Sequence, residues 1–208
     1  MATSGIIWTY ALVEDECRLR SNAISNWRLT PTVALDIISQ SVDKIAKELI
    51  ESGNEHYVET KTGLAIASYA NSFNTVASYS IDISAVSPYP HKILSLLVTN
   101  AGDATDYRWI NLQDTKSSLD LVAFMPNIFV NALGVREGQA IYIYAGTNFT
   151  IDVTASTVDT AMIKYLRQPI IASASRSTKV DVPDTHIGFL LDEVTKRFLE
   201  QTTEMKVA

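Results

Sequence analysis

The side chains that most often carry out chemistry are few and widely spaced in this chain. The three histidines, His56, His91 and His186, lie far apart, and none has an acid or a second ligand at a spacing typical of a catalytic or metal site. Surface or contact histidines are the simpler interpretation. The sequence therefore predicts no metal site and no bound cofactor.

Cys17 is the only cysteine, which excludes a disulfide or a thiolate metal cluster within one chain. It follows Asp15 and Glu16 and precedes Arg18 in a segment with helical character. A nucleophilic thiolate needs a base and a lowered pKa, and the neighbouring sequence supplies neither. We expect a buried structural thiol.

Two pairs of acids could in principle act as acid and base: Asp103 with Asp106, and Asp181 with Asp184. All four lie at predicted turn or cap positions, where Asp is expected for local hydrogen bonding alone. The sequence also contains no phosphate-binding glycine loop, no nucleophile-elbow serine motif and no zinc-protease HExxH motif. We therefore predict that the protein is not an enzyme, with a small hydrolase using an acid pair as an alternative.

Composition indicates a folded protein rather than a disordered or membrane-spanning one. Of the 208 residues, 47% are hydrophobic and 19% are charged, and the net charge of −6 gives no drive toward tight binding of a phosphate backbone. An acidic surface can still line a passage for nucleic acid. No apolar run approaches the roughly 18–20 residues of a membrane-spanning helix, and no basic region precedes the N-terminal apolar run as in a secretory signal.

Three segments have helical patterns. A helix is expected over residues 12–27, and a second begins with Thr30 as cap and Pro31 in the first helical position and stops at Gly53. Asp184 is the expected N-cap of the last helix. Its apolar residues follow helical spacing on one face: Ile187, Leu190, Leu191, Val194 and Phe198.

The middle of the chain has strand chemistry. Residues 76–83 alternate between apolar and polar, residues 91–99 suit a buried strand, and a turn at 100–103 leads to a hairpin partner over 107–112. Gly134 and Gly138 are expected in a turn. A second hairpin is expected to join residues 139–145 and 149–153, and a last strand covers 162–166. Residues 115–132 could form a short helix broken by Pro126.

This order predicts the α+β class, with N-terminal helices and a C-terminal helix packed around an antiparallel β-sheet or small β-sandwich. We expect a single domain over residues 1–208. Its helical part would comprise 11–55 and 184–205, and its β-rich part 57–170.

Several short segments occur in an order known from one family. They are the helices over 12–25 and 31–52, the strand over 139–144, the strand IKYLRQP over 163–169 that ends in a tyrosine, a basic residue and a proline, the extended VDVP over 180–183, and the helix over 184–204. In this order they resemble the head-to-tail connector or adaptor (ring) proteins of short-tailed bacteriophages, including the tail tubular A type and the ring proteins of the crAss-like group. The mid-chain segments 81–84 and 87–90 depart from that family's Leu-Pro-Asp-like corner.

The resemblance implies a structural virion protein without enzymatic activity. It would form a ring, commonly a dodecamer, between the portal protein and the tail nozzle or tube protein, and DNA would pass through the lumen without sequence-specific binding. It would be made in the host cytoplasm, would reside at the head–tail junction of the virion, and would have no membrane partner. A capsid or tail-fibre accessory binding module is the alternative.

Segments that fit no predicted element are candidate partner contacts. One is the Ser-rich stretch with Ala172, Ser173, Ser175, Arg176 and Lys179, and the other is the C-terminal segment with these residues: Met205, Lys206, Val207 and Ala208. The first ten residues are a third such segment.

Overall fold

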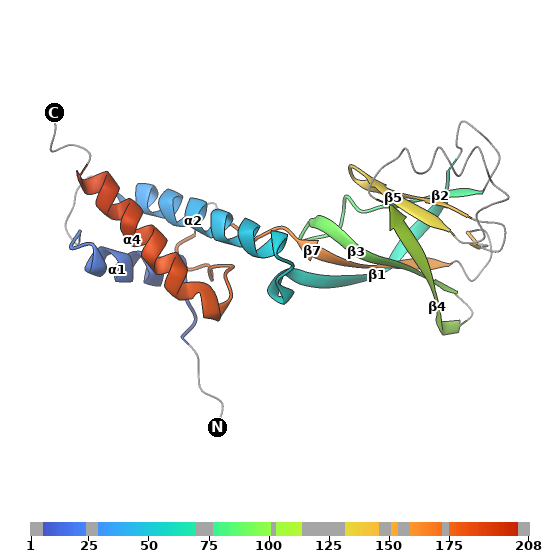
Figure 1. The fold of residues 1–208 in the computed structure, drawn as a ribbon, viewed down its shortest axis with the longest axis horizontal. Helices are drawn as coiled ribbons and strands as arrows, with labels where there is room; N and C mark the ends of the chain where they lie inside the picture. Colours follow the sequence, from blue (N-terminus) through green and yellow to red (C-terminus); the bar gives the residue numbers. More distant parts are fainter. Residues whose placement is uncertain are drawn as a thin grey trace, which may run out of the picture. The chain divides into compact units, whose positions relative to one another are not determined.

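The chain folds into two compact units (Figure 1). The computed structural model describes residues 6–23, 29–69, 77–100, 103–113, 132–145, 151–153, 159–171 and 175–203, without the side chains of residues 100, 103–106 and 113. The helical unit comprises Met1–His56 and Pro169–Ala208, and the barrel unit comprises Tyr57–Gln168. Each unit has its own apolar core.

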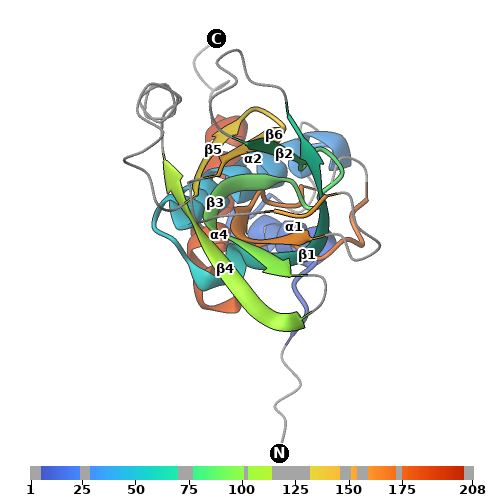
Figure 2. The ribbon, with the colours of Figure 1, turned by 90° about the vertical axis from the view of Figure 1, so that its right-hand side faces the viewer.

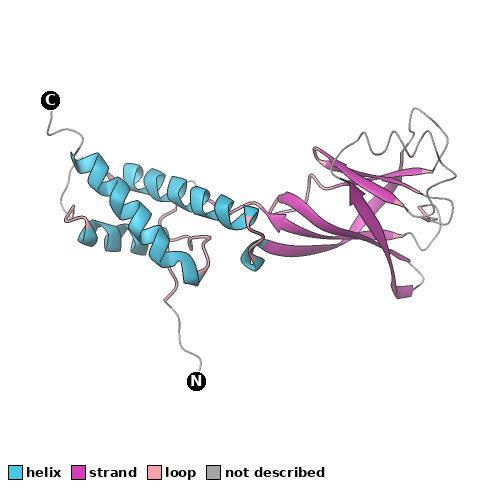
Figure 3. Cartoon of the chain, viewed as in Figure 1, coloured by secondary structure: helices cyan, strands magenta, loops and turns pink. Residues whose placement is uncertain are grey.

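The helical unit contains α1 (Tyr10–Arg20), α2 (Pro31–Glu51) and α4 (Ile187–Thr203), drawn as helices in Figure 3. Two short 3-10 helices are η1 (Glu55–Tyr57), which follows α2, and η2 (Asp184–His186), which directly precedes α4. The predicted start of α2 is confirmed, because the Thr30 hydroxyl accepts a hydrogen bond from the Val33 amide and Pro31 is the first helical residue. Gly53 follows the helix with a φ of 75°, as expected for a stop.

Two other helix boundaries differ from the prediction. The first helix is shifted toward the N-terminus: Thr9 caps it and it ends at Arg20, after which Asn22 has a φ of 52°. Asp184 is not the N-cap of the last helix, because it lies inside the 3-10 turn and Pro183 holds the cap position. An acid in a first turn is favourable near the helix dipole even without a capping hydrogen bond.

The helical core is formed by one face of each helix. All five apolar residues predicted to line one face of the last helix are buried. They pack against side chains of α1 and α2 in a single cluster. The cluster also includes residues of the segment that precedes η2, called the returning segment below. Its main members are Tyr10, Val13, Cys17, Ile38, Val42, Leu190, Val194, Phe198, Val180 and Val182. Burial of these faces, rather than helix propensity, holds the three helices together.

The barrel unit corrects the predicted fold class. Among the described residues its strands are β1 (Val58–Ser68), β2 (Ser78–Asp82), β3 (Pro90–Asn100), β4 (Asp103–Gln113), β5 (Leu133–Glu137), β6 (Ala140–Tyr144) and β7 (Thr160–Arg167). They close in the order β1-β2-β6-β5-β4-β3-β7, and every pair is antiparallel except the parallel β4–β5 pair. The sheet is therefore a closed mixed barrel, not an open antiparallel sheet or sandwich with helices packed on it.

Two long strands close the barrel. β1 pairs with β7 through residues 58–65 and with β2 through 66–68, and β4 pairs with β3 through 103–110 and with β5 through 111–113. Each strand thus passes from one sheet, β1-β7-β3-β4, into a second, β1-β2-β6-β5-β4 (Figure 2). Gly63, with a φ of 70°, lies where the β1–β7 register shifts, as expected for a bulge that bends a strand.

The strand predictions were partly right. The β3–β4 hairpin is confirmed. The predicted second hairpin, between residues 139–145 and 149–153, is wrong. β6 pairs with β5 on one edge and with β2 on the other, and residues 151–153 form no strand. The expected turn between Gly134 and Gly138 is instead strand β5. Of the possible helix over 115–132, all but the last residue lies outside the described part of the chain.

Side chains fill the barrel interior. The core consists mainly of branched aliphatic residues from every named strand except β5, including Ile66, Ile81, Leu96, Val98, Ile110, Ile141, Ile143 and Ile163. Gly134 faces this core, where a β-carbon would lie 3.1 Å from both Ile110 Cγ2 and Leu112 Cδ2. As in other small barrels, the interior is a packed core.

Candidate functional site

The histidines do not form a joint site. His56 Nε2 lies 3.2 Å from Asp181 Oδ1, and His186 Nδ1 lies 2.9 Å from the Thr185 hydroxyl, whereas His91 belongs to the barrel unit. No group of three or more His, Cys, Asp and Glu residues in the described part of the chain is arranged to hold a metal ion.

Cys17 is a buried core thiol, as expected. Its Sγ lies 3.5 Å from the Leu191 carbonyl oxygen, and it contacts the apolar cluster between the helices. Burial raises the pKa of the Cys17 thiol to about 11, because the thiolate would lose its hydration. A thiol in this state is neither a nucleophile nor a redox sensor at neutral pH.

Only the second predicted acid pair has described side chains. Asp181 accepts hydrogen bonds locally: Oδ2 lies 2.7 Å from the Ile170 amide and Oδ1 faces His56. Asp184 lies in the first turn of η2. The side chains of Asp103 and Asp106 lie outside the described part of the structure.

The Ser-rich segment is held by the helical unit through a buried carboxylate. Glu14 is 2% exposed, and its two oxygens lie 2.9 Å from an Arg18 guanidinium nitrogen and 2.8 Å from Arg176 Nη2. Arg18 also donates to the carbonyl oxygens of Leu29 and Ala23. One acid therefore ties α1 to the start of α2 and to the returning segment.

The other candidate contacts on this segment are placed as follows. Lys179 forms a β-bridge with Thr9, and the Ser175 hydroxyl lies 2.8 Å from that of Ser177. Arg176 keeps 46% of its side chain exposed beside Glu14. The remaining candidates lie outside the described residues: Ala172, Ser173, Met205, Lys206, Val207 and Ala208.

The Tyr-x-Arg sequence before Pro169 has a structural role in the barrel. Arg167 is buried, its Nε lies 3.0 Å from Glu59 Oε1, and its guanidinium carbon lies 5.1 Å from the centre of the Tyr57 ring. The Tyr165 hydroxyl donates to the other Glu59 oxygen at 3.3 Å. Burial and the Glu59 charge raise the pKa of Tyr165. These contacts join the first residues of β1 to the last residues of β7.

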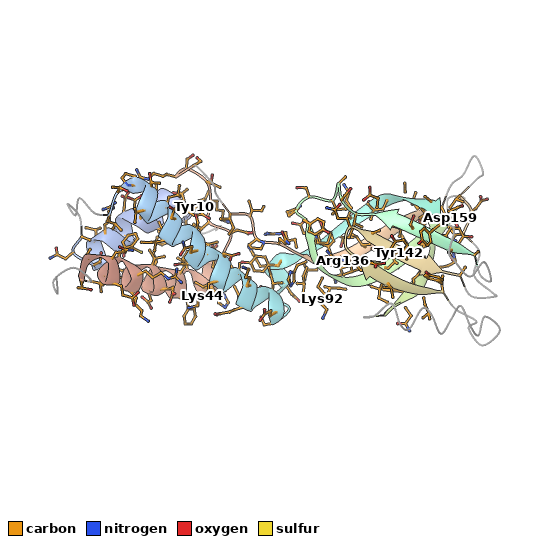
Figure 4. All side chains as sticks on the ribbon, turned by 90° about the horizontal axis from the view of Figure 1, so that it is seen from above. Tyr10, Lys44, Lys92, Arg136, Tyr142 and Asp159 are labelled. Carbon is orange, nitrogen blue, oxygen red and sulfur yellow. The ribbon has the colours of Figure 1, made fainter. Side chains whose placement is uncertain are left out.

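Two further arginines, Arg136 and Arg108, make ion-pair or hydrogen-bond contacts within the barrel unit; Figure 4 labels Arg136 and Asp159, the partner of Arg108. Arg136 donates to the carbonyl oxygens of His91 and Pro90 at 2.6 and 2.7 Å. Arg108 lies 2.8 Å from a buried Asp159 oxygen that also accepts from the Asp152 amide at 3.0 Å. Paired charges of this kind order strand ends and loops.

A groove lies between α2 and α4 in the helical unit. It has a volume of about 570 Å³, and its apolar walls include Ile45, Leu49 and Phe189, the last with 67% of its surface exposed. Lys44 on α2 (labelled in Figure 4) bonds across it to Glu193 Oε1 at 3.1 Å. Apolar walls with a charged rim suit an apolar side chain of a partner better than they suit a polar substrate.

A second exposed apolar surface lies on the outer wall of the barrel. Trp109 and Tyr107, two residues apart on β4, are 68% and 46% exposed. This surface was not located in the sequence analysis. The sequence does contain a signal for it: Tyr107 and Trp109 are two residues apart, and the alternate residue Ile110 is buried. For the exposed Phe189, the signal is that it lies off the apolar face of the last helix.

Within the described residues, no helix is long and apolar enough to cross a membrane. Comparison of the chain with protein-family models gives no match, and comparison with curated proteins gives none.

Proposed function

We propose that this protein is the structural subunit of a ring that joins the portal to the tail of a short-tailed bacteriophage. The support for this assignment is the order of elements, in which two helices precede a block of strands and one helix closes the chain. The same order underlies the resemblance to connector proteins described above.

The observation that carries an assembly role is the exposure of large apolar side chains on both units. Phe189 stands in the groove of the helical unit, and Tyr107 and Trp109 stand on the barrel wall. Exposed aromatic groups at such positions are typical of protein interfaces. In the described part of the chain, no group of His, Cys, Asp and Glu residues that could hold a metal ion accompanies them. A subunit with two different contact surfaces can associate head to tail and close into a ring.

The proposed conduit for DNA lies between copies and not inside one chain. The barrel interior is filled by core side chains, so a passage requires several subunits around an axis. The net charge of −6 disfavours persistent binding to phosphates, which suits a passage through which DNA must slide.

The proposal is tested by the mass and symmetry of the purified protein. We expect native mass spectrometry and electron microscopy to show a closed ring, alone or on addition of the portal protein from the same phage. A protein that stays monomeric at every concentration, with and without portal, and that is missing from purified virions would overturn the proposal.

A pair of variants on α4 tests whether the groove takes part. Phe189→Ser removes the exposed ring, and we expect it to weaken assembly or portal binding. Lys196→Ser, which changes another residue lining the same groove, is the matched control and should leave both unchanged. Because the Phe189 side chain is exposed, both variants should retain the helical circular dichroism of the parent protein.

A further inference from the structure

The sheet β1-β7-β3-β4 has two long edges that meet no other described strand. Along residues 58–65, β1 is paired on the β7 side only, because β2 joins it at 66–68. Along residues 103–110, β4 is paired on the β3 side only, because β5 joins it at 111–113. In the described part of the barrel, these edges carry backbone groups directed away from their single partner strand.

Side chains at both edges are exposed. On β1, Thr60, Lys61 and Thr62 are exposed, and on β4 Tyr107 and Trp109 are exposed. Long exposed edges present rows of backbone donors and acceptors that can pair with another strand. Apart from Lys61, the exposed positions named here carry no charge that would discourage such pairing.

The two edges match each other in direction and in length. Neighbouring strands in this sheet are antiparallel throughout, so β1 and β4, at its two ends, run in opposite directions. Placing β4 of one copy beside β1 of the next continues the antiparallel alternation without turning either copy over. Figure 2 shows β4 and β1 on either side of β3.

The outward side chains are also compatible. Trp109 and Tyr107 point out of the barrel, since the alternate residue Ile110 is in its core. Thr60 on β1 is β-branched and exposed. Aromatic residues facing β-branched residues across strands are favourable pairs.

From these observations we propose that β4 of one copy pairs with β1 of the next, so that the sheet continues from subunit to subunit. The inference rests on the proposed function and names the contact that would build the ring. Such a contact is heterologous, and it closes only if the rotation from copy to copy closes. In this arrangement, the β1 edge of each copy pairs with the β4 edge of one neighbouring copy, and its β4 edge pairs with the β1 edge of another.

Mixing variants that each carry one added cysteine tests the contact in the full chain. Thr60→Cys and Thr62→Cys place thiols on the β1 edge, and Tyr107→Cys and Trp109→Cys place them on the β4 edge. Facing residues in antiparallel strands lie close enough for disulfides. After mild oxidation, we expect a cross-linked dimer when a β1 variant is mixed with a β4 variant, and none from either variant alone. The buried Cys17 should not contribute.

The matched control uses a strand that has no free edge. Lys164→Cys lies on β7, between β1 and β3, and should give no cross-link with Trp109→Cys. Replacing Tyr107 and Trp109 together by lysine should raise the concentration needed for half-assembly by about tenfold, because two cross-strand pairs are lost and charged edges resist pairing. Unchanged thermal unfolding of this variant would show that the barrel itself is intact.

The possible outcomes separate the contact from the ring. A protein that forms rings but cross-links in none of the four β1–β4 mixtures overturns the contact and leaves the proposed function standing. Cross-linking of Trp109→Cys with itself would indicate a two-fold contact and would also overturn it. A monomer under all conditions overturns both.

Discussion

Replacing Glu14 tests whether the buried ion cluster holds the helical unit together. In Glu14→Ala, Arg18 and Arg176 lose the acceptor that they share. We expect the helical unit to be destabilised while the barrel, which has a separate core, stays folded.

The magnitude follows from how much of each partner water can reach. Removing one member of a fully buried pair costs about 3–5 kcal/mol, because the other charge is stranded. Here the Arg18 side chain is 14% exposed and keeps its hydrogen bonds to the carbonyl oxygens of Ala23 and Leu29. The Arg176 side chain is 46% exposed, so water can solvate its charge. We therefore expect a loss of about 2–3 kcal/mol. For Arg176→Ala the expected loss is about 0.5–1 kcal/mol, as for a largely exposed pair.

Urea unfolding followed by circular dichroism at 222 nm measures both losses, since the helices dominate the signal. Hydrogen exchange then locates them: we expect α1 and α4 amides to lose protection in Glu14→Ala and barrel amides to keep theirs. A loss below about 1 kcal/mol for Glu14→Ala would refute the reasoning. So would equal losses for Glu14→Ala and Arg176→Ala, because the difference in exposure would then have no effect.

Three further predictions concern separate parts of the molecule. Gly134→Val should destabilise the barrel by about 2–3 kcal/mol, because the added carbons have no space in a packed interior. Gly134→Ala should destabilise it less, and thermal unfolding of the two variants measures the difference. Cys17 should resist alkylation at pH 8 in native protein and react in urea, because burial raises its thiol pKa to about 11; rapid native labelling in mass spectrometry would contradict this. The hydrogen bond from Lys44 holds the pKa of Glu193 below its ordinary value, so its stabilising contribution is present above that ordinary value and is lost as pH falls through the lowered one. Urea midpoints from pH 7 to 3 should therefore fall less in Lys44→Met than in the parent.

The helices were predictable because their signals are local. Thr30, Pro31 and Gly53 define the ends of α2 within one stretch of chain, and the apolar spacing of the last helix identified its buried face. The mispredicted end of α1 lies beside a contact made outside the helix. α1 ends at Arg20, where the cluster around Glu14 ties Arg18 to the carbonyl oxygen of Leu29.

The barrel was not predictable in the same way. Alternation identified residues 76–83 and 91–99 as strand material, and a turn signal identified the β3–β4 hairpin. The predicted partner of β6 was wrong, because β6 pairs with β2, a segment that is remote from it in sequence. Strand periodicity reports which face is buried and carries no information on which strand lies alongside.

By itself, the sequence determined the three apolar helix faces, the strand material between α2 and α4, the negative charge and the shortage of catalytic groups. These follow from residue types and short-range spacing. The tertiary structure decided that the strands close into a barrel, that Glu14 and Arg176 meet, and that Trp109 is exposed on the outer face of β4. Such features depend on contacts between distant segments, and these are fixed when the whole chain buries its apolar surface together.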